Sequence, residues 1–427
     1  MVPIIDFDSC GFARLLQAGT VRSAAPLLCE GVCNMAFREA YLDNAATARP
    51  YPEVVARVAE VMGQGFGNAS AEHARGHRAH ALLEESRSVI ARALGVDPSE
   101  VFFTSGGTES NNLAIRGAAE AARVAHPDRD GIVASAVEHP SVTKTVRGLK
   151  RSGWRVAYVG AANGDFRMPV LRHALDARTA LITCMRVQNE MGYLMPVEGV
   201  VAARDELAPQ ALVHTDCVQA FGKVPVRPRE LGVDLASLSG HKIGGPQGIG
   251  ALYVKAGTPM FTTAFGGGQE RGLRSGTEAL PLIAGFAEAV RITCGRIDEE
   301  LSRIGALKRE VVDGVRALWP EVRMNSRDDG SPYIVCFSVP GLDNTACLDF
   351  LSERGVYVSK SSACETLHPN VPEEDWRTKH PMSLHLCGVP KDLTESTLRV
   401  SFSQQSVEED VRQLLDALRD FKASADA

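Results

Sequence analysis

One lysine of this sequence lies among glycines, in a setting that suits nucleophilic chemistry. It is Lys242 in the segment SGHKIGGPQGIG, residues 239–250, which follows the apolar run 234–238. Backbone packed closely around an amine removes water from it, lowers its pKa and makes it a usable nucleophile and base. The segment is not a nucleotide-binding P-loop, because Ile243 follows the lysine where that motif has Ser or Thr. Taken alone, Lys242 could also be an ordinary surface lysine in a turn.

Polar side chains also follow other short apolar runs of the chain. The segment SGGT, residues 105–108, opens a helix after the run 101–104, and the free N–H groups at such a helix start suit a phosphate. His139 follows the run 131–136, Asn189 follows 180–185, and Asp216 and Gln219 follow 211–215. Each of these residues alone is commonly a turn former or a helix cap. In an open sheet of parallel strands, however, they would meet at one edge, where ligands bind.

Together these residues form the inventory that pyridoxal phosphate requires. That cofactor needs a lysine to bond with its aldehyde, an anion beside its pyridinium nitrogen and a site for its phosphate. Lys242, Asp216 and the segment 105–108 are candidates for the three roles, and His139 is a candidate to stack on the ring. We therefore interpret the predicted strand ends as a pyridoxal phosphate site.

The elements that must hold these residues are indicated by the pattern of apolar runs. Strand-like runs alternate with helix-length segments, at 101–104, 131–136, 154–159, 180–185, 211–215, 234–239 and 250–254. Apolar strands that alternate with helices predict an α/β domain with a mostly parallel, seven-stranded sheet. A long helical pattern then covers 280–318, and strand-like runs at 335–339 and 397–402 belong to a smaller α+β domain.

Three parts of the chain follow from this pattern. We expect an N-terminal extension at 1–40, a large cofactor-binding domain at 41–296 and a small C-terminal domain at 297–427. The segment 41–50 can pack with the small domain.

Composition limits the function to small-molecule chemistry. The chain has 427 residues, 44% of them hydrophobic, and a formal charge of −6 without a basic stripe, so nucleic acid or an anionic membrane is not an expected partner. We expect a cytoplasmic protein, because no apolar run reaches the length of a membrane helix and because Asp6 and Asp8 lie where a signal peptide carries basic residues. Its ten cysteines are scattered, as reduced thiols are.

A series of motifs resembles the cysteine desulfurases, which belong to the class V aminotransferase group of fold-type I pyridoxal phosphate enzymes. The motifs occur in the family's order from about Tyr41 to Phe421: YLDNAAT, GFGNAS, FFTSGGTESNN, EHPSV, QNEMG, HTDCVQAFGK, SGHKIGGPQGIGALYV and GGGQERGLRSGT. The resemblance implies conversion of L-cysteine to L-alanine by a homodimer that holds pyridoxal 5'-phosphate, with the sulfur passed to an acceptor protein or small molecule.

The resemblance also implies a role for each matching residue. Lys242 would bond to the cofactor, Asp216 would pair with the pyridinium nitrogen, Gln219 would contact the phenolic oxygen and His139 would stack on the ring. Asn189 and Arg399 would hold the substrate, since Arg offers a two-pronged grip on a carboxylate. Residues implied at the phosphate are Gly107, Thr108, Ser239, His241 and, from a second subunit, Thr277.

The resemblance implies that Cys364, in the segment KSSACE, is the nucleophile that receives sulfur as a persulfide. This loop departs from the family's pattern. Lys360 and Ser361 stand where the family usually has serine and glycine, and the charge of Glu365 would raise the thiol's pKa.

Two other functions stay open on the sequence. One is a selenocysteine lyase or a C–S lyase acting on a cysteine conjugate, in which Cys364 is dispensable. The other is a cofactor-free binding scaffold, which the set Lys242, Asp216, His139 and Thr108 argues against. A metal is not expected, because the spacing of the possible soft ligands matches no usual paired pattern, these being Cys364, His368, His380, His385 and Cys387.

Overall fold

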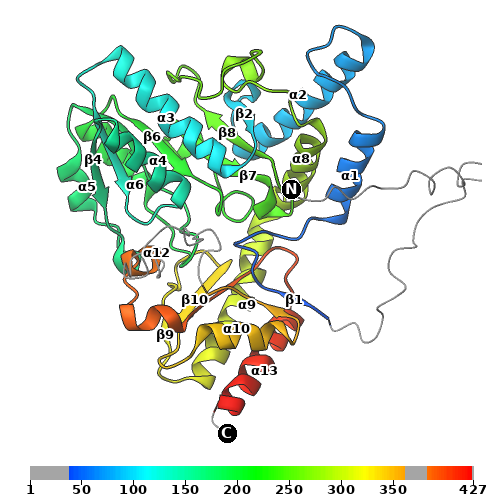
Figure 1. Ribbon diagram of the computed structural model, residues 1–427, viewed down its shortest axis with the longest axis vertical. Coiled ribbons are helices and arrows are strands. Elements are labelled where there is room, and N and C mark those ends of the chain that lie inside the picture. The colour runs from blue at the N-terminus through cyan, green and yellow to red at the C-terminus, as the bar shows by residue number, and fades with distance from the viewer. Residues whose placement is uncertain (1–37, 361–381, 426–427) are drawn as a thin grey trace, which may run out of the picture. The chain divides into compact units, whose positions relative to one another are not determined.

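The computed structural model describes residues 38–360 and 382–425, and Glu39 begins one compact unit (Figure 1). A seven-stranded sheet with the strand order β2-β8-β7-β6-β5-β3-β4 is its largest element. The strands are β2 (Val101–Thr104), β3 (Gly131–Ser135), β4 (Arg155–Val159), β5 (Thr179–Thr183), β6 (Leu212–Asp216), β7 (Leu235–Ser239) and β8 (Gly250–Val254). β8 runs in the direction opposite to the other six strands of this sheet, so the predicted mostly parallel, seven-stranded arrangement is confirmed.

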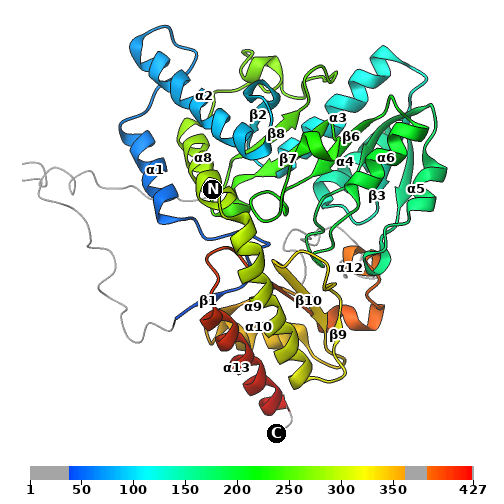
Figure 2. The same ribbon diagram turned by 180° about the vertical axis from the view of Figure 1, so that it is seen from behind.

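Helices cover both faces of the sheet (Figures 1 and 2). They are α1 (Pro52–Gly63), α2 (Ala74–Leu94), α3 (Gly107–Ala125), α4 (Pro140–Arg151), α5 (Met168–Ala174), α6 (Val197–Leu207), α7 (Pro228–Leu231) and α8 (Leu280–Cys294). Adjacent residues of one strand point to opposite faces. Ile132 therefore packs in the core under α3 and α4, whereas Val133 packs in the core under α5 and α6. Two apolar layers result, which explains why the strands read as continuous apolar runs.

A second, three-stranded sheet has the order β12-β10-β9 and is antiparallel. Its strands are β9 (Arg323–Met324), β10 (Ile334–Ser338) and β12 (Thr397–Ser401), and the helices of this part are α9 (Ile297–Leu318), α10 (Asn344–Ser352), α12 (Met382–Leu386) and α13 (Glu408–Ala425). A separate apolar core joins this sheet to α9, α10 and α13. The helical pattern predicted at 280–318 thus consists of two helices, α8 and α9, with Gly295 and Arg296 between them.

The beginning of the described chain packs with this second sheet. Strand β1 (Ala40–Tyr41) pairs in parallel with β11 (Val356–Tyr357), and Asp43 forms a bridge with Ser401 at the end of β12. The Asn44 side chain donates to Tyr41 O and Ser401 O, both at 2.9 Å. These bonds hold the segment that follows, Ala45 and Ala46, beside the carboxyl ends of the large sheet. Within the described residues, no helix is both long and apolar enough to span a membrane.

Candidate active site

Lys242 lies in a short 3-10 turn, Gly240–Ile243, immediately after β7. The turn ends at Gly244, whose φ of 75° is a conformation that a residue with a side chain rarely adopts. The Lys242 ammonium donates to Ala45 O at 2.7 Å and to Ala46 O at 2.5 Å. This amine is therefore held at the carboxyl ends of the large sheet by the end of β7, by the turn that follows and by the segment Ala45–Ala46.

Asp216, the last residue of β6, is 3% exposed and is fixed by two donors. Val218 N–H donates to Oδ1 at 2.9 Å, and Asn111 Nδ2 donates to Oδ2 at 2.7 Å. The same Asn111 amide lies 2.8 Å from Ser141 Oγ, which is also 2.7 Å from His139 Nδ1. One hydrogen-bonded chain therefore connects the carboxylate to the imidazole.

His139 caps the start of α4, where its Nδ1 accepts from Ser141 N–H at 3.1 Å. Burial lowers the pKa of His139, with Lys242 adding to the effect and Asp216 opposing it. A pKa below the ordinary 6.5 keeps the ring mostly neutral at pH 7. Beside it, Glu138 is buried, and burial together with the charge of Asp216 raises the pKa of Glu138 to about 8.

The first turn of α3 supplies an anion site. Its N-cap is Gly106, which has no side chain to satisfy the first N–H groups of a 19-residue helix. Gly107 leaves room there, because a Cβ at that position would come within 2.5 Å of Val218 Cγ2 and 3.7 Å of Ser239 Cβ. Ser239 Oγ is buried and has no hydrogen-bond partner in the described structure. An acceptor such as phosphate would satisfy both the N–H groups and this hydroxyl.

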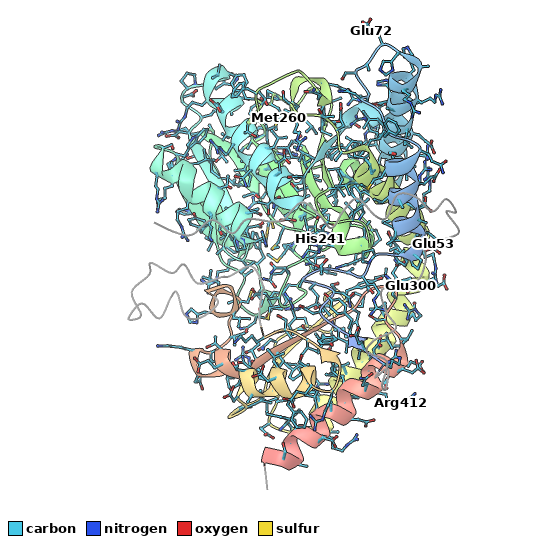
Figure 3. All side chains as sticks on the ribbon, turned by 45° about the vertical axis from the view of Figure 1, so that its right-hand side comes forward. Glu53, Glu72, His241, Met260, Glu300 and Arg412 are labelled. Carbon is cyan, nitrogen blue, oxygen red and sulfur yellow. The ribbon has the colours of Figure 1, made fainter. Side chains whose placement is uncertain are left out.

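Gln219 and His241 line the same cavity as Lys242. Gln219 Nε2 donates to Ala45 O at 2.9 Å, so it shares this acceptor with Lys242. Burial and the charges of Lys242 and Lys223 lower the pKa of His241 to about 3, so its imidazole is neutral. His241 Nδ1 is 3.1 Å from Thr47 Oγ1, and Figure 3 shows His241 between the helices of the large sheet and the small sheet.

Arg399 reaches the cavity from β12 of the small sheet. It is 2% exposed, its Nη2 donates to Asp43 Oδ1 at 2.9 Å and its Nη1 donates to Asn189 O at 3.1 Å. Its Nε has no partner in the described structure. Burial raises the pKa of Asp43, although Arg399 and Lys242 oppose this shift. Asp43 thus fixes the Arg399 guanidinium, and the Nε–H of Arg399 can still donate a hydrogen bond to a ligand.

All but one of the predicted residues of the described chain meet in one cavity of about 160 Å³. Predicted residues that line it are Gly107, Thr108, His139, Asn189, Asp216, Gln219, Ser239, His241, Lys242 and Arg399. Thr277 is exposed and does not line it, and Cys364 lies outside the described residues. So do Ser361, Glu365, His368 and His380, and the described part of the chain contains no group of three possible metal ligands.

The chemistry of this cavity fits pyridoxal phosphate. The amine of Lys242 can bond with an aldehyde, the buried Asp216 carboxylate can pair with a pyridinium, and the helix start with the unsatisfied Ser239 hydroxyl can take a phosphate. The neutral His139 borders the same space.

Three supporting residues were missed by the sequence reasoning. Asn111 and Ser141 fix Asp216 and His139, and Asp43 holds Arg399. Asn111 had a local signal, because it follows Thr108 by three residues and so lies on the same helix face. Asp43 lies in the motif YLDNAAT, but nothing in the sequence links it to Arg399, 356 positions away.

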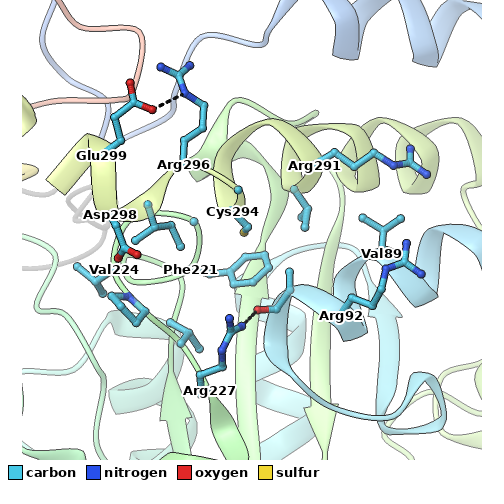
Figure 4. Close-up of a pocket in the computed structure, with 17 residues that line it drawn as sticks. Val89, Arg92, Phe221, Val224, Arg227, Arg291, Cys294, Arg296, Asp298 and Glu299 are labelled. Carbon is cyan, nitrogen blue, oxygen red and sulfur yellow. Dashed lines mark hydrogen bonds and ion pairs between the residues drawn. The ribbon is translucent and has the colours of Figure 1, made fainter.

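A larger cavity of about 640 Å³ lies at the junction of α8 and α9 (Figure 4). Three of the arginines that line it are engaged in contacts of their own. Arg296 pairs with Glu299 at 3.5 Å, Arg291 pairs with Glu85 at 2.8 Å, and Arg227 donates to a backbone carbonyl. None of the predicted site residues in the described chain lines this cavity, so it is not the candidate site.

Comparisons with known proteins agree with this site. The model of the aminotransferase class-V family matches residues 40–414. A cysteine desulfurase of Gluconacetobacter diazotrophicus is 36% identical over 382 residues, 88% of this chain and 92% of that protein. The IscS-like cysteine desulfurase of Mycobacterium tuberculosis is 36% identical over 389 residues, 89% of this chain and 95% of that protein.

Solved structures show the same fold. A NifS-like protein superposes with a TM-score of 0.82 at 30% identity, over 90% of this chain and 99% of the other. SspA, solved in complex with cysteine, superposes with a TM-score of 0.73 at 30% identity, over 86% and 99% of the two chains. Sequence and fold together show that this chain belongs to the class-V aminotransferase family, within the cysteine desulfurases.

Proposed function

We propose that this chain converts L-cysteine to L-alanine with pyridoxal phosphate and keeps the sulfur on Cys364. In the net step, the bond between the substrate's Cβ and its sulfur breaks and a bond between that sulfur and Cys364 Sγ forms. L-cysteine and the Cys364 thiol become L-alanine and a Cys364 persulfide, so no outside oxidant or reductant is needed. When bound, the cofactor supplies an electron sink that stabilises the carbanion at the substrate's Cα.

The chain's own residues would bind, orient and move protons. Lys242 would hold the cofactor through Nζ. When the substrate amine takes the place of Nζ, the freed Lys242 amine would accept the proton from the substrate's Cα. Asp216 would keep the ring nitrogen protonated, since Asn111 and the Val218 N–H orient its carboxylate. Arg399 would bind the substrate carboxylate through donors that include the unpaired Nε, with Asn189 beside it.

The observation that carries the proposal is the meeting of Lys242, Asp216 and the α3 N-terminus in one cavity. The cysteine bound to SspA, which is 30% identical, supports cysteine as the substrate. We place the enzyme in the cytoplasm and propose a homodimer in which the exposed Thr277 reaches the phosphate of the partner subunit. The sulfur acceptor would be a protein or a small molecule.

Purified protein loaded with pyridoxal phosphate tests this function. With L-cysteine it should form alanine and a persulfide that alkylation traps at Cys364, and borohydride should attach the cofactor to Lys242. Cys364→Ser should bind the cofactor normally but form no alanine from L-cysteine. Alanine formation that survives Cys364→Ser would favour a lyase acting on selenocysteine or a cysteine conjugate. A protein that takes up no cofactor would refute the proposal.

A further inference from the structure

A buried lysine, Lys223, lies behind the candidate site and is not used in the mechanism above. It is 3% exposed, and its Nζ donates to Gln219 Oε1 at 2.9 Å. The two residues are four apart in consecutive turns after β6, where Phe221 N–H donates to Cys217 O and Val224 N–H donates to Ala220 O. This spacing places both side chains on the same side of the turns.

The surroundings of Lys223 disfavour its charge. Among the described residues no carboxylate lies within ion-pair distance, and the charged groups that face it are the cations Lys242 and Arg399. Burial, followed by these two cations, lowers the pKa of Lys223 to about 7. Its ammonium lies 5.9 Å from the centre of the Tyr333 ring, a contact that compensates weakly. A buried lysine without an anionic partner costs stability, so its contact with Gln219 is the feature to explain.

That contact selects one orientation of the Gln219 amide. An ammonium has three N–H donors and no acceptor, so it can be met only by the carbonyl end of the amide. With Oε1 held by Lys223, Nε2 must point the other way, to Ala45 O, beside the Lys242 amine. One cation that lowers the pKa of Lys223 is Lys242 itself. When the Lys242 nitrogen is bonded to an aldehyde and carries no proton, this charge is absent, which favours the charged form of Lys223.

The geometry points to Lys223 as a positioning residue that fixes the Gln219 amide, so that Gln219 Nε2–H donates to the phenolic oxygen of pyridoxal phosphate. This inference rests on the proposed cofactor site. Without Lys223 the amide could turn and present an oxygen to the phenolate, where it would repel rather than stabilise charge. Lys223 would thus set the electronic state of the cofactor without touching it.

The visible absorption of the bound cofactor tests the inference without measuring activity. This absorption reports whether the nitrogen that Lys242 contributes carries a proton. A donor at the phenolic oxygen favours the unprotonated form. In the holoenzyme, Lys223→Met should therefore raise the midpoint pH of the absorption change by about one unit, the size expected for one hydrogen bond to a charged group.

Two comparisons separate positioning from a general effect of losing a buried lysine. Lys308 is also buried, but it donates to Arg327 O at 2.7 Å in the small-sheet part, so Lys308→Met should leave the midpoint unchanged. In a Gln219→Leu background, Lys223→Met should cause no additional shift, because the two residues act as one unit. An unchanged midpoint in Lys223→Met, or the same shift with and without Gln219, would overturn the inference.

The wild-type holoenzyme gives a check that needs no variant. In its crystal structure Lys223 Nζ should lie within hydrogen-bond distance of Gln219 Oε1, and Gln219 Nε2 within that distance of the phenolic oxygen. A Gln219 amide turned away from the cofactor would overturn the inference even if the variants fail to fold. If wild-type protein gains no visible band with pyridoxal phosphate, the proposed function fails and this inference fails with it. If the band forms but Lys223→Met leaves its midpoint in place, only the inference fails.

Discussion

Gly107→Ala is the change whose effect on cofactor binding can be worked out most directly. The new Cβ would lie 2.5 Å from Val218 Cγ2, about 1 Å closer than an ordinary carbon contact. Either Val218 or the first turn of α3 must move, and both line the cavity. Overpacking of this kind costs about 1–3 kcal/mol, which corresponds to cofactor binding weakened by about 5-fold to 150-fold.

The assay is a titration of cofactor-free protein with pyridoxal phosphate, followed by absorbance. Adding Val218→Ala to Gly107→Ala removes the colliding methyl groups and should restore most of the affinity. Gly148→Ala on α4 is the matched control, because a Cβ there meets nothing within 4 Å, and it should leave affinity unchanged. Wild-type affinity in Gly107→Ala, or a double variant as weak as the single one, would refute the steric reasoning.

Three further predictions concern the charged groups. The pKa of Glu138 is about 8 in the folded protein against 4.5 ordinarily, so the folded state loses stability as pH rises from 4.5 to 8. Glu138→Gln should therefore raise the Tm of cofactor-free protein at pH 8.5 and leave it almost unchanged at pH 4.5. An equal change of Tm at both pH values would contradict this. Glu270→Ala removes the carboxylate that Arg87 binds at 2.8 and 2.9 Å in the interior. Urea denaturation should show that the free energy of unfolding falls by about 3–5 kcal/mol, because the Arg87 charge is left buried without its partner. A fall below about 1 kcal/mol would count against this ion pair as a stabilising contact. Arg399→Lys should raise the KM for L-cysteine about 10-fold to 100-fold in steady-state assays. The reason is that an ammonium cannot bind Asp43 and the substrate carboxylate in the two-pronged geometry of a guanidinium. An unchanged KM would exclude Arg399 from carboxylate binding.

The large sheet was predictable because most of its strands are buried on both faces. Continuous apolar runs such as 234–239 leave little choice but a covered parallel strand, and the observed β7 begins one residue later. The polar residues after these strands could then be placed at one edge by topology alone. Helix ends were less predictable: Gly295 and Arg296 divide the span 280–318 although both sides have a helical pattern.

Contacts between distant segments could not be predicted. Nothing near Arg399 indicates that Asp43 would hold it, and nothing near Lys242 indicates that Ala45 O would accept a hydrogen bond from it. Both contacts depend on the pairing of β1 with β11, which is only two residues long and has no sequence pattern of its own. Lys223 was visible in the motif HTDCVQAFGK, but its position 5.9 Å from the Tyr333 ring has no signal in the sequence.

The bridge between Asp43 and Ser401 has a consequence for biosynthesis. Asp43 and its partner Arg399 are 356 positions apart, so the ribosome must make all of the residues between them before the two can meet. A nascent chain can complete the large sheet much earlier, yet Lys242 would still lack the neighbours that β12 holds in place. The pocket is therefore completed only after the large sheet, and a chain cut short before Thr397 would carry the lysine without the rest of its surroundings.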